Sequence, residues 1–249
     1  MPSPLPELSI IIPSFNEERR LPRALERIRD YLAAKQLDAE VIVVDDGSTD
    51  RTAQAVEEWR ARVPSLRLVS NGRNRGKGFS VRHGMLEARG RLALFTDADL
   101  SAPIEEADKL LDALRHFDVA IGSRAVDRRL IEVHQSRFRE LAGICFNWLV
   151  RLVTGLPFVD TQCGFKAFRR ERARIVFEQQ RTEGFGFDPE VLFLARRHGL
   201  QAVEIPVRWA HDPHTKVNVL RDSLLMFGEL FLIRWNWLLG RYPRRRIGM

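Results

Sequence analysis

Two aspartates follow an apolar segment near the middle of the chain, in a spacing that suits binding of a divalent cation. Residues 92–95 are apolar and fit a buried strand, and Asp97 and Asp99 come where this strand should end. Side chains alternate along an extended backbone, so both carboxylates leave it on the same side and can share one cation through oxygen ligands. Such a cation would hold a diphosphate. The alternative is that the two aspartates cap the helix that follows.

Two further polar clusters follow apolar segments that fit strands. Pro13 and Glu17 follow the first segment, and Asp45 and Asp46 follow the second. The carboxyl ends of the strands converge on one crevice in a doubly wound sheet. With the basic glycine-rich loop at 71–78, this pattern suits a nucleotide whose base and ribose meet Asp45 or Asp46. The glycines lack the GxGxxG spacing of a Rossmann dinucleotide site and the GKS/T ending of a P-loop.

Strands and helices alternate over the first 123 residues. This alternation predicts an α/β fold with a doubly wound, mostly parallel sheet and helices on both faces. The strands expected from the apolar pattern are 9–13, 40–44, 66–70, 92–96 and 119–122. The helices expected between them are 14–35, 51–62, 79–88 and 103–115.

The second half of the chain is less regular. It begins with a basic loop, 124–139, and no Gly/Ser/Pro-rich linker separates it from the first half. We therefore expect one domain over 7–234, in which 1–123 binds the nucleotide and 124–234 shapes the acceptor and sugar side, followed by a basic membrane-proximal tail, 235–249. The elements expected here are helices 140–154, 170–178, 185–198 and 219–239 and a strand at 202–207, with a loop entering a short strand at 159–166.

The composition is that of a folded globular protein with an anionic partner. The 249 residues are 45% hydrophobic and 29% charged, with a net charge of +7. Nucleic acid, a phosphorylated substrate or an anionic membrane would each suit this charge. Two cysteines argue against a disulfide scaffold or a zinc cluster. No signal peptide is recognisable, and no apolar run reaches the roughly 18 to 20 residues of a spanning helix, so we expect a soluble or peripheral protein.

Four motifs together resemble family 2 glycosyltransferases of the GT-A fold. They are Ser-Ile-Ile-Ile-Pro-Ser-Phe-Asn-Glu at 9–17, Val-Val-Asp-Asp-Gly-Ser-Thr-Asp at 43–50, Asn-Arg-Gly-Lys-Gly at 74–78 and Thr-Asp-Ala-Asp-Leu-Ser at 96–101. More narrowly, 160–166, 187–190 and the region of Lys216 and Val217 resemble the dolichyl-phosphate (polyprenyl-phosphate) β-glucosyltransferases. The resemblance extends from about residue 7 to residue 234. It implies an inverting, metal-dependent hexosyltransferase that moves glucose from UDP-glucose to a polyprenyl phosphate, dolichyl or undecaprenyl.

The resemblance also implies roles for individual residues. Asp97 and Asp99 would hold Mg²⁺ or Mn²⁺ against the donor diphosphate, and Asp160 and Asp188 would complete the catalytic set. Residues expected to bind the nucleotide sugar are Pro13, Glu17, Asp45, Asp46, Lys77, Asp97, Ala98 and Arg124. Residues expected to bind the acceptor are Arg137, Gln162, Lys166 and Lys216.

One stretch departs from the family pattern. Where the family often has Gly-Ser before the lysine, this chain has His211-Asp-Pro-His214-Thr-Lys216. Two histidines three residues apart can be metal ligands, but such a pair in a loop is more often solvated.

The reaction implied by the resemblance is a single displacement. A phosphate oxygen of the polyprenyl phosphate attacks the anomeric carbon opposite UDP, which inverts the α-linked donor to a β-linked product. The second pKa of a phosphomonoester is about 6, so the acceptor is largely ionised at neutral pH and needs no strong base. A cation that neutralises charge on the departing diphosphate lowers the main barrier.

Three other functions fit parts of the sequence. A GDP-mannose-dependent polyprenyl-phosphate mannose synthase, or a family 2 enzyme with another nucleotide sugar, shares the motifs of the first half. A non-catalytic protein that binds nucleotide sugars is a remoter alternative, against which the intact Asp97, Asp99 and Lys77 argue. Nucleic-acid binding is not favoured, because the arginines are spread along the chain and the acids sit at expected strand ends. The sequence does not predict an oligomeric state.

Aromatic residues near arginines suggest contact with a membrane. Phe146 and Trp148 lie on one expected helix, and either the interface or a packed core explains them. The last helix favours the interface, because arginines at 241–246 follow its apolar face directly. We therefore expect a peripheral protein on the cytoplasmic face of a membrane. The aromatic residues of this last helix are Phe227, Phe231, Trp235 and Trp237.

Overall fold

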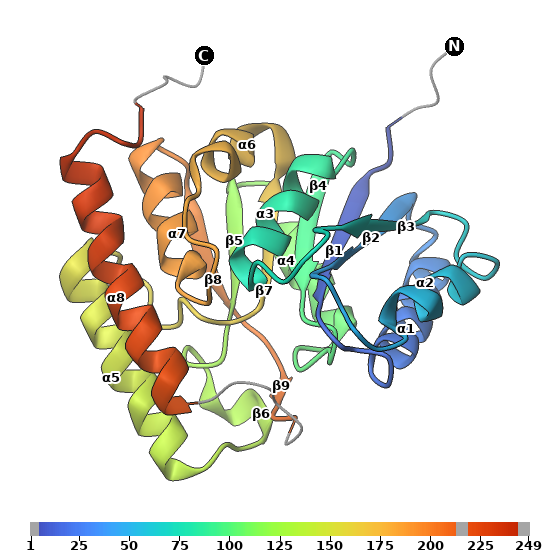
Figure 1. The fold of residues 1–249 in the computed structure, drawn as a ribbon, viewed down its shortest axis with the longest axis horizontal. Helices are drawn as coiled ribbons and strands as arrows, with labels where there is room; N and C mark the ends of the chain where they lie inside the picture. The colour runs from blue at the N-terminus through green and yellow to red at the C-terminus, as the bar shows by residue number, and fades with distance from the viewer. Residues whose placement is uncertain (1–4, 213–218, 244–249) are drawn as a thin grey trace.

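A seven-stranded sheet forms the centre of the molecule in the computed structural model, which describes residues 5–212 and 219–243 (Figure 1). All neighbouring strands are parallel except β7, which is antiparallel to both β4 and β5. In spatial order the strands are β3 (Leu66–Ser70), β2 (Ala39–Asp45), β1 (Leu8–Ser14), β4 (Leu92–Thr96), β7 (Phe165–Arg169), β5 (Val119–Ser123) and β8 (Ala202–Pro206). A separate two-stranded sheet joins β6 (Ile131–Val133) and β9 (Trp209–Ala210).

Helices cover both faces of the sheet (Figure 1). Helices α1, α2 and α4 cover one face, α3, α6 and α7 cover the other, and α5 and α8 lie side by side outside α7. Their bounds are α1 (Leu21–Lys35), α2 (Thr52–Trp59), α3 (Lys77–Glu87), α4 (Ala107–Ala113), α5 (Arg137–Thr154), α6 (Arg170–Gln179), α7 (Phe187–Arg197) and α8 (Val219–Leu238), with 3₁₀ turns at Ile104–Glu106 and Arg128–Leu130.

The strands are apolar on both sides because each side of the sheet packs against helices. In β1, Ile10 and Ile12 belong to the core beneath α1, α2 and α4, and Ile11 belongs to the core beneath α3, α6 and α7. A strand buried on both faces has an apolar run without alternation, which is the pattern that the sequence shows at 9–12. The predicted doubly wound, mostly parallel sheet is confirmed.

Two elements differ from the expectations. The first helix begins at Leu21 rather than near residue 14. Asn16 has a left-handed backbone with φ 55°. Its side-chain oxygen accepts the N–H of Thr49 at 2.8 Å, and this contact keeps the residues before Leu21 out of the helix. The strand Phe165–Arg169 inserts between β4 and β5 and runs against them. The alternation of strands and helices could not reveal this insertion, because both of its partners are distant in the sequence.

The second half contains more structure near the expected loop and tail. The basic segment 124–139 includes β6 and the start of α5. Helix α8 extends to Leu238, and the hydroxyl of the buried Tyr242 donates to Glu190 of α7 at 2.5 Å. In the described part of the chain, no helix is both long and apolar enough to cross a bilayer.

Candidate active site

The ends of β1, β2 and β4 meet at one edge of the sheet, where Asp45 and Asp46 approach the glycine-rich loop. The Asp46 carboxylate accepts the backbone N–H groups of Arg75 at 2.9 Å and Gly76 at 2.8 Å, and the side-chain amide of Asn71 at 2.7 Å. Asp45 accepts the N–H of Ser48 at 3.1 Å. Both aspartates therefore shape the turns around the expected nucleoside site.

The glycine-rich loop depends on the absence of side chains at its contacts. Gly76 has φ 105°, and a Cβ there would lie 2.4 Å from the backbone oxygen of Glu183. A Cβ on Gly78 would lie 2.6 Å from the Phe187 side chain. These contacts fix the start of α3, whose first residue, Lys77, then reaches the end of β4.

Lys77 and Asp97 form an ion pair, with 2.5 Å between Nζ and Oδ1. Burial alone would lower the pKa of Lys77, but the charges of Asp97 and of nearby Asp188 and Asp99 raise it above its ordinary value. The ammonium is therefore charged at neutral pH, at the point where Asp97 and Asp99 end the strand. A cation at this place favours a diphosphate.

The two strand-end carboxylates fit a divalent cation. Burial and the neighbouring charge of Asp97 raise the pKa of Asp99, so a positive ion would relieve a real repulsion. A Cβ on Gly164 would lie 2.1 Å from Oδ2 of Asp97, so the backbone closely cradles this carboxylate. Among the described residues no group of three or more potential ligands occurs. Two carboxylates are enough for Mg²⁺ or Mn²⁺, because Mg²⁺ usually takes its other ligands from substrate phosphates and water.

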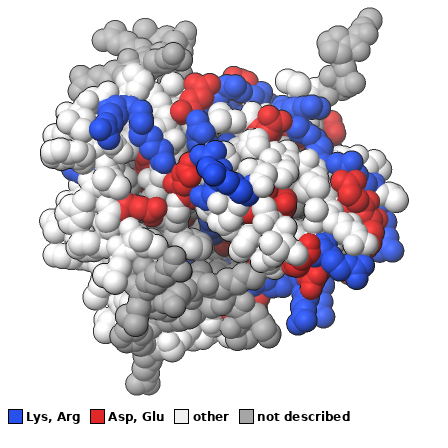
Figure 2. Space-filling model, in the orientation of Figure 1, with Lys and Arg blue, Asp and Glu red and all other residues white. Residues whose placement is uncertain are grey.

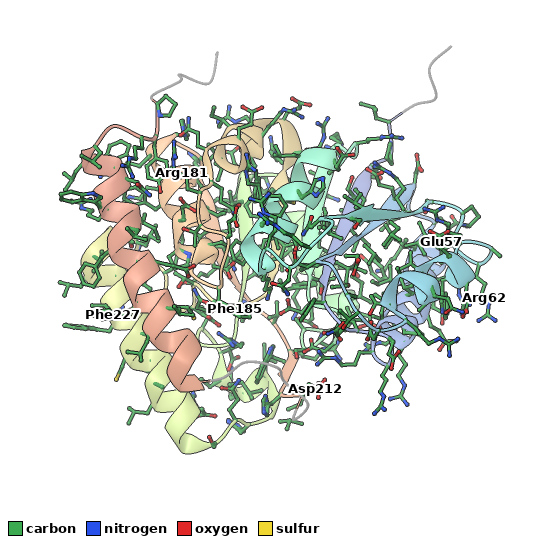
Figure 3. The ribbon with its side chains drawn as sticks, in the orientation of Figure 1. Glu57, Arg62, Arg181, Phe185, Asp212 and Phe227 are labelled. Carbon is green, nitrogen blue, oxygen red and sulfur yellow. The ribbon has the colours of Figure 1, made fainter. Side chains whose placement is uncertain are left out.

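A cavity of about 370 Å³ opens over these carboxylates. Charged residues line it at the strand ends, and where α5 and α8 approach it the lining includes apolar residues beside Glu140 and Asn147. Phe185, which also lines the cavity, lies beside α8 in Figure 3. The charged lining includes Lys77, Asp97, Asp99, Arg124, Arg128, Asp160 and Asp188, and the apolar lining includes Ile144, Phe146, Phe185 and Met226.

Arg124 and Asp160 form a two-pronged ion pair in the cavity wall. Nε and Nη2 of Arg124 donate to the carboxylate at 2.7 and 2.8 Å, and its backbone N–H donates at 3.0 Å. The guanidinium also lies over the ring of Trp209, 5.4 Å from the centroid. Burial would raise the pKa of Asp160, but Arg124 holds it below its ordinary value. The pair is thus rigid and ionised.

Lys166 and Asp188 form a second, fully buried pair. The Lys166 ammonium donates to Asp188 and, at 2.6 Å, to the carbonyl of Cys163. Burial raises the pKa of Asp188 despite this partner. Asp188 lines the cavity, whereas Lys166 is 0% exposed and lies behind it. Lys166 therefore positions Asp188, and its contact with an acceptor stays a prediction.

The remaining predicted residues lie at different depths. Gln162 lines the cavity, and its Nε2 atom is buried with no hydrogen-bond partner among the described residues, as expected of a group that meets a ligand. Glu17 accepts two hydrogen bonds from Arg20, at 2.5 and 2.6 Å. Pro13 is partly exposed, whereas the other residues of β1 are buried. Ala98 is buried in the core.

Some predicted residues lie outside the part of the chain that the structure describes. Lys216 and His214 lie outside the described residues, and so does the side chain of Arg137. His211 is described: it lines the cavity, and its ring stacks on Trp209 with centroids 6.0 Å apart.

The structure adds two glutamates that the sequence reasoning did not assign. Glu190 is fully buried and accepts the N–H of Arg181 at 3.1 Å and of Thr182 at 2.7 Å. Glu229 of α8 accepts the N–H of Gly186 at 2.8 Å. Together they hold the segment 181–186, which packs on the glycine-rich loop. A lone acid in the apolar run 224–239 was the one indication of Glu229 in the sequence.

Arg20 connects the strand-end carboxylate Asp99 to the segment after β9. Its guanidinium lies 3.8 Å from Asp99 and 2.9 Å from Asp212, which follows β9 (Figure 3). The sequence analysis assigned a role to neither residue, because Arg20 lies outside the motifs and only the histidines were considered in the stretch that contains Asp212.

Comparisons with known proteins agree with this geometry. The model of the family described as Glycosyl transferase family 2 matches residues 9–174. The dolichyl-phosphate β-glucosyltransferase of Saccharomyces cerevisiae is 36% identical over 94% of this chain and 76% of its own length. That of Drosophila melanogaster is 38% identical over 96% of this chain and 78% of its own length.

Solved structures share the fold. Glucosyl-3-phosphoglycerate synthase from Mycobacterium tuberculosis, crystallised with Mn²⁺ and UDP-glucose, aligns with a TM-score of 0.63 at 20% identity, over 98% of this chain and 81% of that one. The same enzyme with Mg²⁺ and UDP aligns with a TM-score of 0.60 at 20% identity, over 98% and 82%. These structures support the GT-A fold. The family match and the curated relatives show that this chain belongs to glycosyl transferase family 2 and groups within it with the dolichyl-phosphate β-glucosyltransferases.

Proposed function

We propose that the protein transfers glucose from UDP-glucose to the phosphate of a polyprenyl phosphate, dolichyl or undecaprenyl, with inversion at the anomeric carbon. The observation that carries this proposal is one cavity with two chemically different ends. Its charged end lies at Asp97 and Asp99, and on its other side α5 and α8 supply the apolar residues Ile144, Phe146 and Met226, with Glu140 beside them. The names of the relatives support the sugar and the lipid.

The charged end would hold the donor. UDP and Mn²⁺ or Mg²⁺ occur in the structural neighbours, and the two carboxylates here fit such an ion. When bound, the ion would neutralise charge on the departing diphosphate, an effect typically worth several kcal/mol. Lys77, charged and half-buried beside Asp97, would add a second positive group to the same phosphates. The nucleoside would bind beside the turns that Asp46 stabilises. Asp45, Glu17, Pro13 and Ala98 would complete this part of the donor site.

The opposite wall would bind the acceptor phosphate. Arg124 is held rigidly by Asp160, so its guanidinium has little conformational freedom to lose when a phosphate binds. Gln162 offers an amide to the sugar or phosphate. Arg137 and Lys216 are further candidates for the acceptor. The phosphate needs no strong base, because its second pKa is about 6. Asp188, fixed by Lys166, would orient the sugar or the attacking oxygen.

The apolar end would admit the start of the polyprenyl chain. Ile144, Phe146, Phe185 and Met226 line it. Because a polyprenyl chain remains in a bilayer, the protein would act as a peripheral protein on the cytoplasmic face. In this division 1–123 holds the nucleotide, 124–234 shapes the sugar and acceptor, and 235–249 lies near the membrane.

A panel of labelled donors tests the proposal. UDP-glucose, UDP-galactose, UDP-N-acetylglucosamine and GDP-mannose would each be incubated with dolichyl or undecaprenyl phosphate and Mg²⁺ or Mn²⁺, and label in the lipid phase counted. We expect lipid-linked label from UDP-glucose. Label from GDP-mannose alone would replace the glucose assignment with a mannose synthase, and no label from any donor would favour a non-catalytic protein that binds nucleotide sugars.

A further inference from the structure

A second cavity, of about 420 Å³, lies at the C-terminal ends of α5 and α7 and is separate from the active site. Three arginines line it, Arg196, Arg197 and Arg234, and no Asp or Glu is among its lining residues as the structure describes them. Its remaining walls include Leu152 and Phe193. A basic cavity of this size with apolar walls fits an anion that is attached to an apolar group.

Helices α5 and α8 carry exposed apolar side chains beside this cavity. On α8, Leu224 is 75% exposed and Leu238 is 69% exposed. Phe227 points away from the sheet in Figure 3, and Figure 2 shows few charged residues over the two helices. We call the following set the α5–α8 apolar surface: Leu141, Ile144, Trp148 and Leu152 of α5, and Leu224, Phe227, Phe231, Trp235 and Leu238 of α8.

The spacing of these residues makes the surface continuous. Successive members are three or four residues apart on each helix, which places them along one face. The inward positions Leu230 and Ile233 are 1% exposed, so the outward apolar residues are additional to those that the core needs. Exposed apolar patches of this extent mark interaction sites in soluble proteins.

The basic cavity and the apolar surface share residues. Leu152 belongs to both, and Arg234 directly precedes Trp235 of the surface. Arg197 lies over the ring of Trp237, with 4.4 Å between its guanidinium carbon and the ring centroid, and this contact orients it. Ile144 belongs both to the surface and to the apolar end of the catalytic cavity. Positive charge, exposed aromatics and the acceptor entrance therefore lie on one side of the molecule.

We propose that the cavity lined by Arg196, Arg197 and Arg234 binds the phosphate of an anionic phospholipid headgroup, while the α5–α8 apolar surface enters the same bilayer. Guanidinium groups suit phosphate because they donate paired hydrogen bonds in one plane. Aromatic and aliphatic side chains flanked by arginine are typical of an interfacial helix. This arrangement would turn the apolar end of the catalytic cavity toward the lipid, so the inference rests on the proposed function for its purpose, although headgroup binding is measurable without it.

A structural role competes with this assignment. Arg196 donates to the carbonyl of Gly155, which follows the last residue of α5, and basic residues often stabilise the C-terminal ends of helices. That role predicts a loss of stability on substitution and no dependence on lipid charge. Arg197 and Arg234 are therefore the better positions for a test.

The test compares two double variants that remove the same charge. Arg197→Gln with Arg234→Gln alters the cavity, and Arg60→Gln with Arg62→Gln alters the opposite end of the molecule, where Arg62 lies over Trp59 much as Arg197 lies over Trp237 (Figure 3). Sedimentation of the full chain with vesicles of phosphatidylcholine, alone or mixed with phosphatidylglycerol, would be measured at about 0.15 M salt. Thermal midpoints would show that both variants fold.

We expect the wild-type chain to prefer the anionic vesicles, and the cavity variant to lose roughly tenfold in affinity for them while the control variant loses much less. Equal losses in both variants would mean that net charge alone acts, and would overturn the proposal. An unchanged cavity variant would do the same. If inorganic phosphate bound the cavity while vesicle binding stayed insensitive to the cavity variant, the site would belong to a soluble phosphate compound instead.

The two proposals fail separately. Neither Arg197 nor Arg234 lines the catalytic cavity. The variant that replaces both should therefore transfer glucose to a short-chain polyprenyl phosphate in detergent at the wild-type rate. A wild-type chain that bound anionic vesicles through these arginines but transferred no glucose would keep the headgroup site and remove the proposed function.

Discussion

The charged end of the candidate active site and the α5–α8 apolar surface differ in what they expose to water. At the candidate site, charged groups such as Asp188 and Asp160 are buried and paired with Lys166 and Arg124. At the surface, apolar side chains such as Leu224 are mostly exposed. Buried charges need fixed partners, and these are supplied within the chain. Exposed apolar side chains lower the free energy only when a partner or a bilayer removes them from water. The charged groups of the candidate site thus find their partners within the chain, whereas the apolar surface needs a partner from outside it.

The largest effect should come from the strand-end carboxylates. Asp97→Asn or Asp99→Asn should lower kcat by roughly a thousandfold, because either change removes a charged ligand from the expected cation. Transfer of label from UDP-glucose, titrated with Mg²⁺ and Mn²⁺, would measure this. Asp30→Asn, at an exposed position of α1, is the matched control and should have no effect. Full activity of Asp99→Asn would remove Asp99 from the metal site.

A smaller effect should follow when the Asp97 carboxylate is displaced without being removed. In Gly164→Ala the new Cβ would meet Oδ2 of Asp97 at 2.1 Å, so the carboxylate must move. We expect about a hundredfold loss in kcat/KM, as is seen when catalytic groups shift by about 1 Å. Gly228→Ala is the control, because apart from the adjacent backbone of its own helix no atom of the described residues lies within 4 Å of the added carbon. Equal activity of the two variants would show that Asp97 tolerates displacement.

The α5–α8 apolar surface should be sensitive to substitution of an apolar side chain by a polar one. Leu224→Ser or Leu238→Ser should weaken vesicle binding by up to roughly tenfold each, because each removes apolar area that a bilayer would cover. Activity on a short-chain acceptor in detergent should not change. Leu5→Ser, at a position 66% exposed in the N-terminal segment, is the control. If Leu5→Ser weakened vesicle binding as much, the α5–α8 surface would not be the membrane contact.

The last effect is on stability rather than on binding or activity, and it concerns Glu40, a buried charge in β2. Burial raises the pKa of Glu40, but Ser9, the N–H of Arg89 and Arg67 together hold it below its ordinary value. A lowered pKa means that the ionised side chain stabilises the fold above the unfolded pKa, about 4.3, and that this contribution is lost as pH falls through the folded pKa. Glu40→Gln should therefore cost about 1–2 kcal/mol at neutral pH.

Denaturant unfolding of Glu40→Gln across the acidic range would check this pH dependence. The midpoints of variant and wild type should approach one another as pH falls. Glu57→Gln, at an exposed position of α2, should follow the wild-type curve throughout. A constant difference between Glu40→Gln and wild type at every pH would assign the loss to packing rather than to ionisation.

The sequence predicted those parts of the molecule that depend on local pattern. Apolar runs bounded by glycine and aspartate predicted the parallel strands. The position of Asp97 and Asp99 after one of these runs predicted a cation site at the carboxyl ends of the strands. The motifs gave the family, which the comparisons confirm. In each case the relevant information lies within about ten consecutive residues.

Long-range contacts account for what the sequence did not predict. The place of β7 depends on hydrogen bonds to strands far away in the chain, and the close approach of Gly164 to Asp97 follows from that place. The first helix begins late because Asn16 bonds to a turn more than thirty residues away. The pairing of Lys166 with Asp188, 22 residues further along the chain, was not predicted either. Such pairs become visible only when the chain is folded.

The anomeric configuration of the product tests the central claim most directly. Wild-type protein would be incubated with UDP-glucose, a short-chain polyprenyl phosphate and Mg²⁺ or Mn²⁺, and the configuration of the lipid product would be determined from its anomeric proton by NMR. Direct attack by the acceptor phosphate predicts a β-linked polyprenyl-phosphate glucose that forms only when a divalent cation is present. An α-linked product, or equal formation of product in excess chelator, would contradict the account.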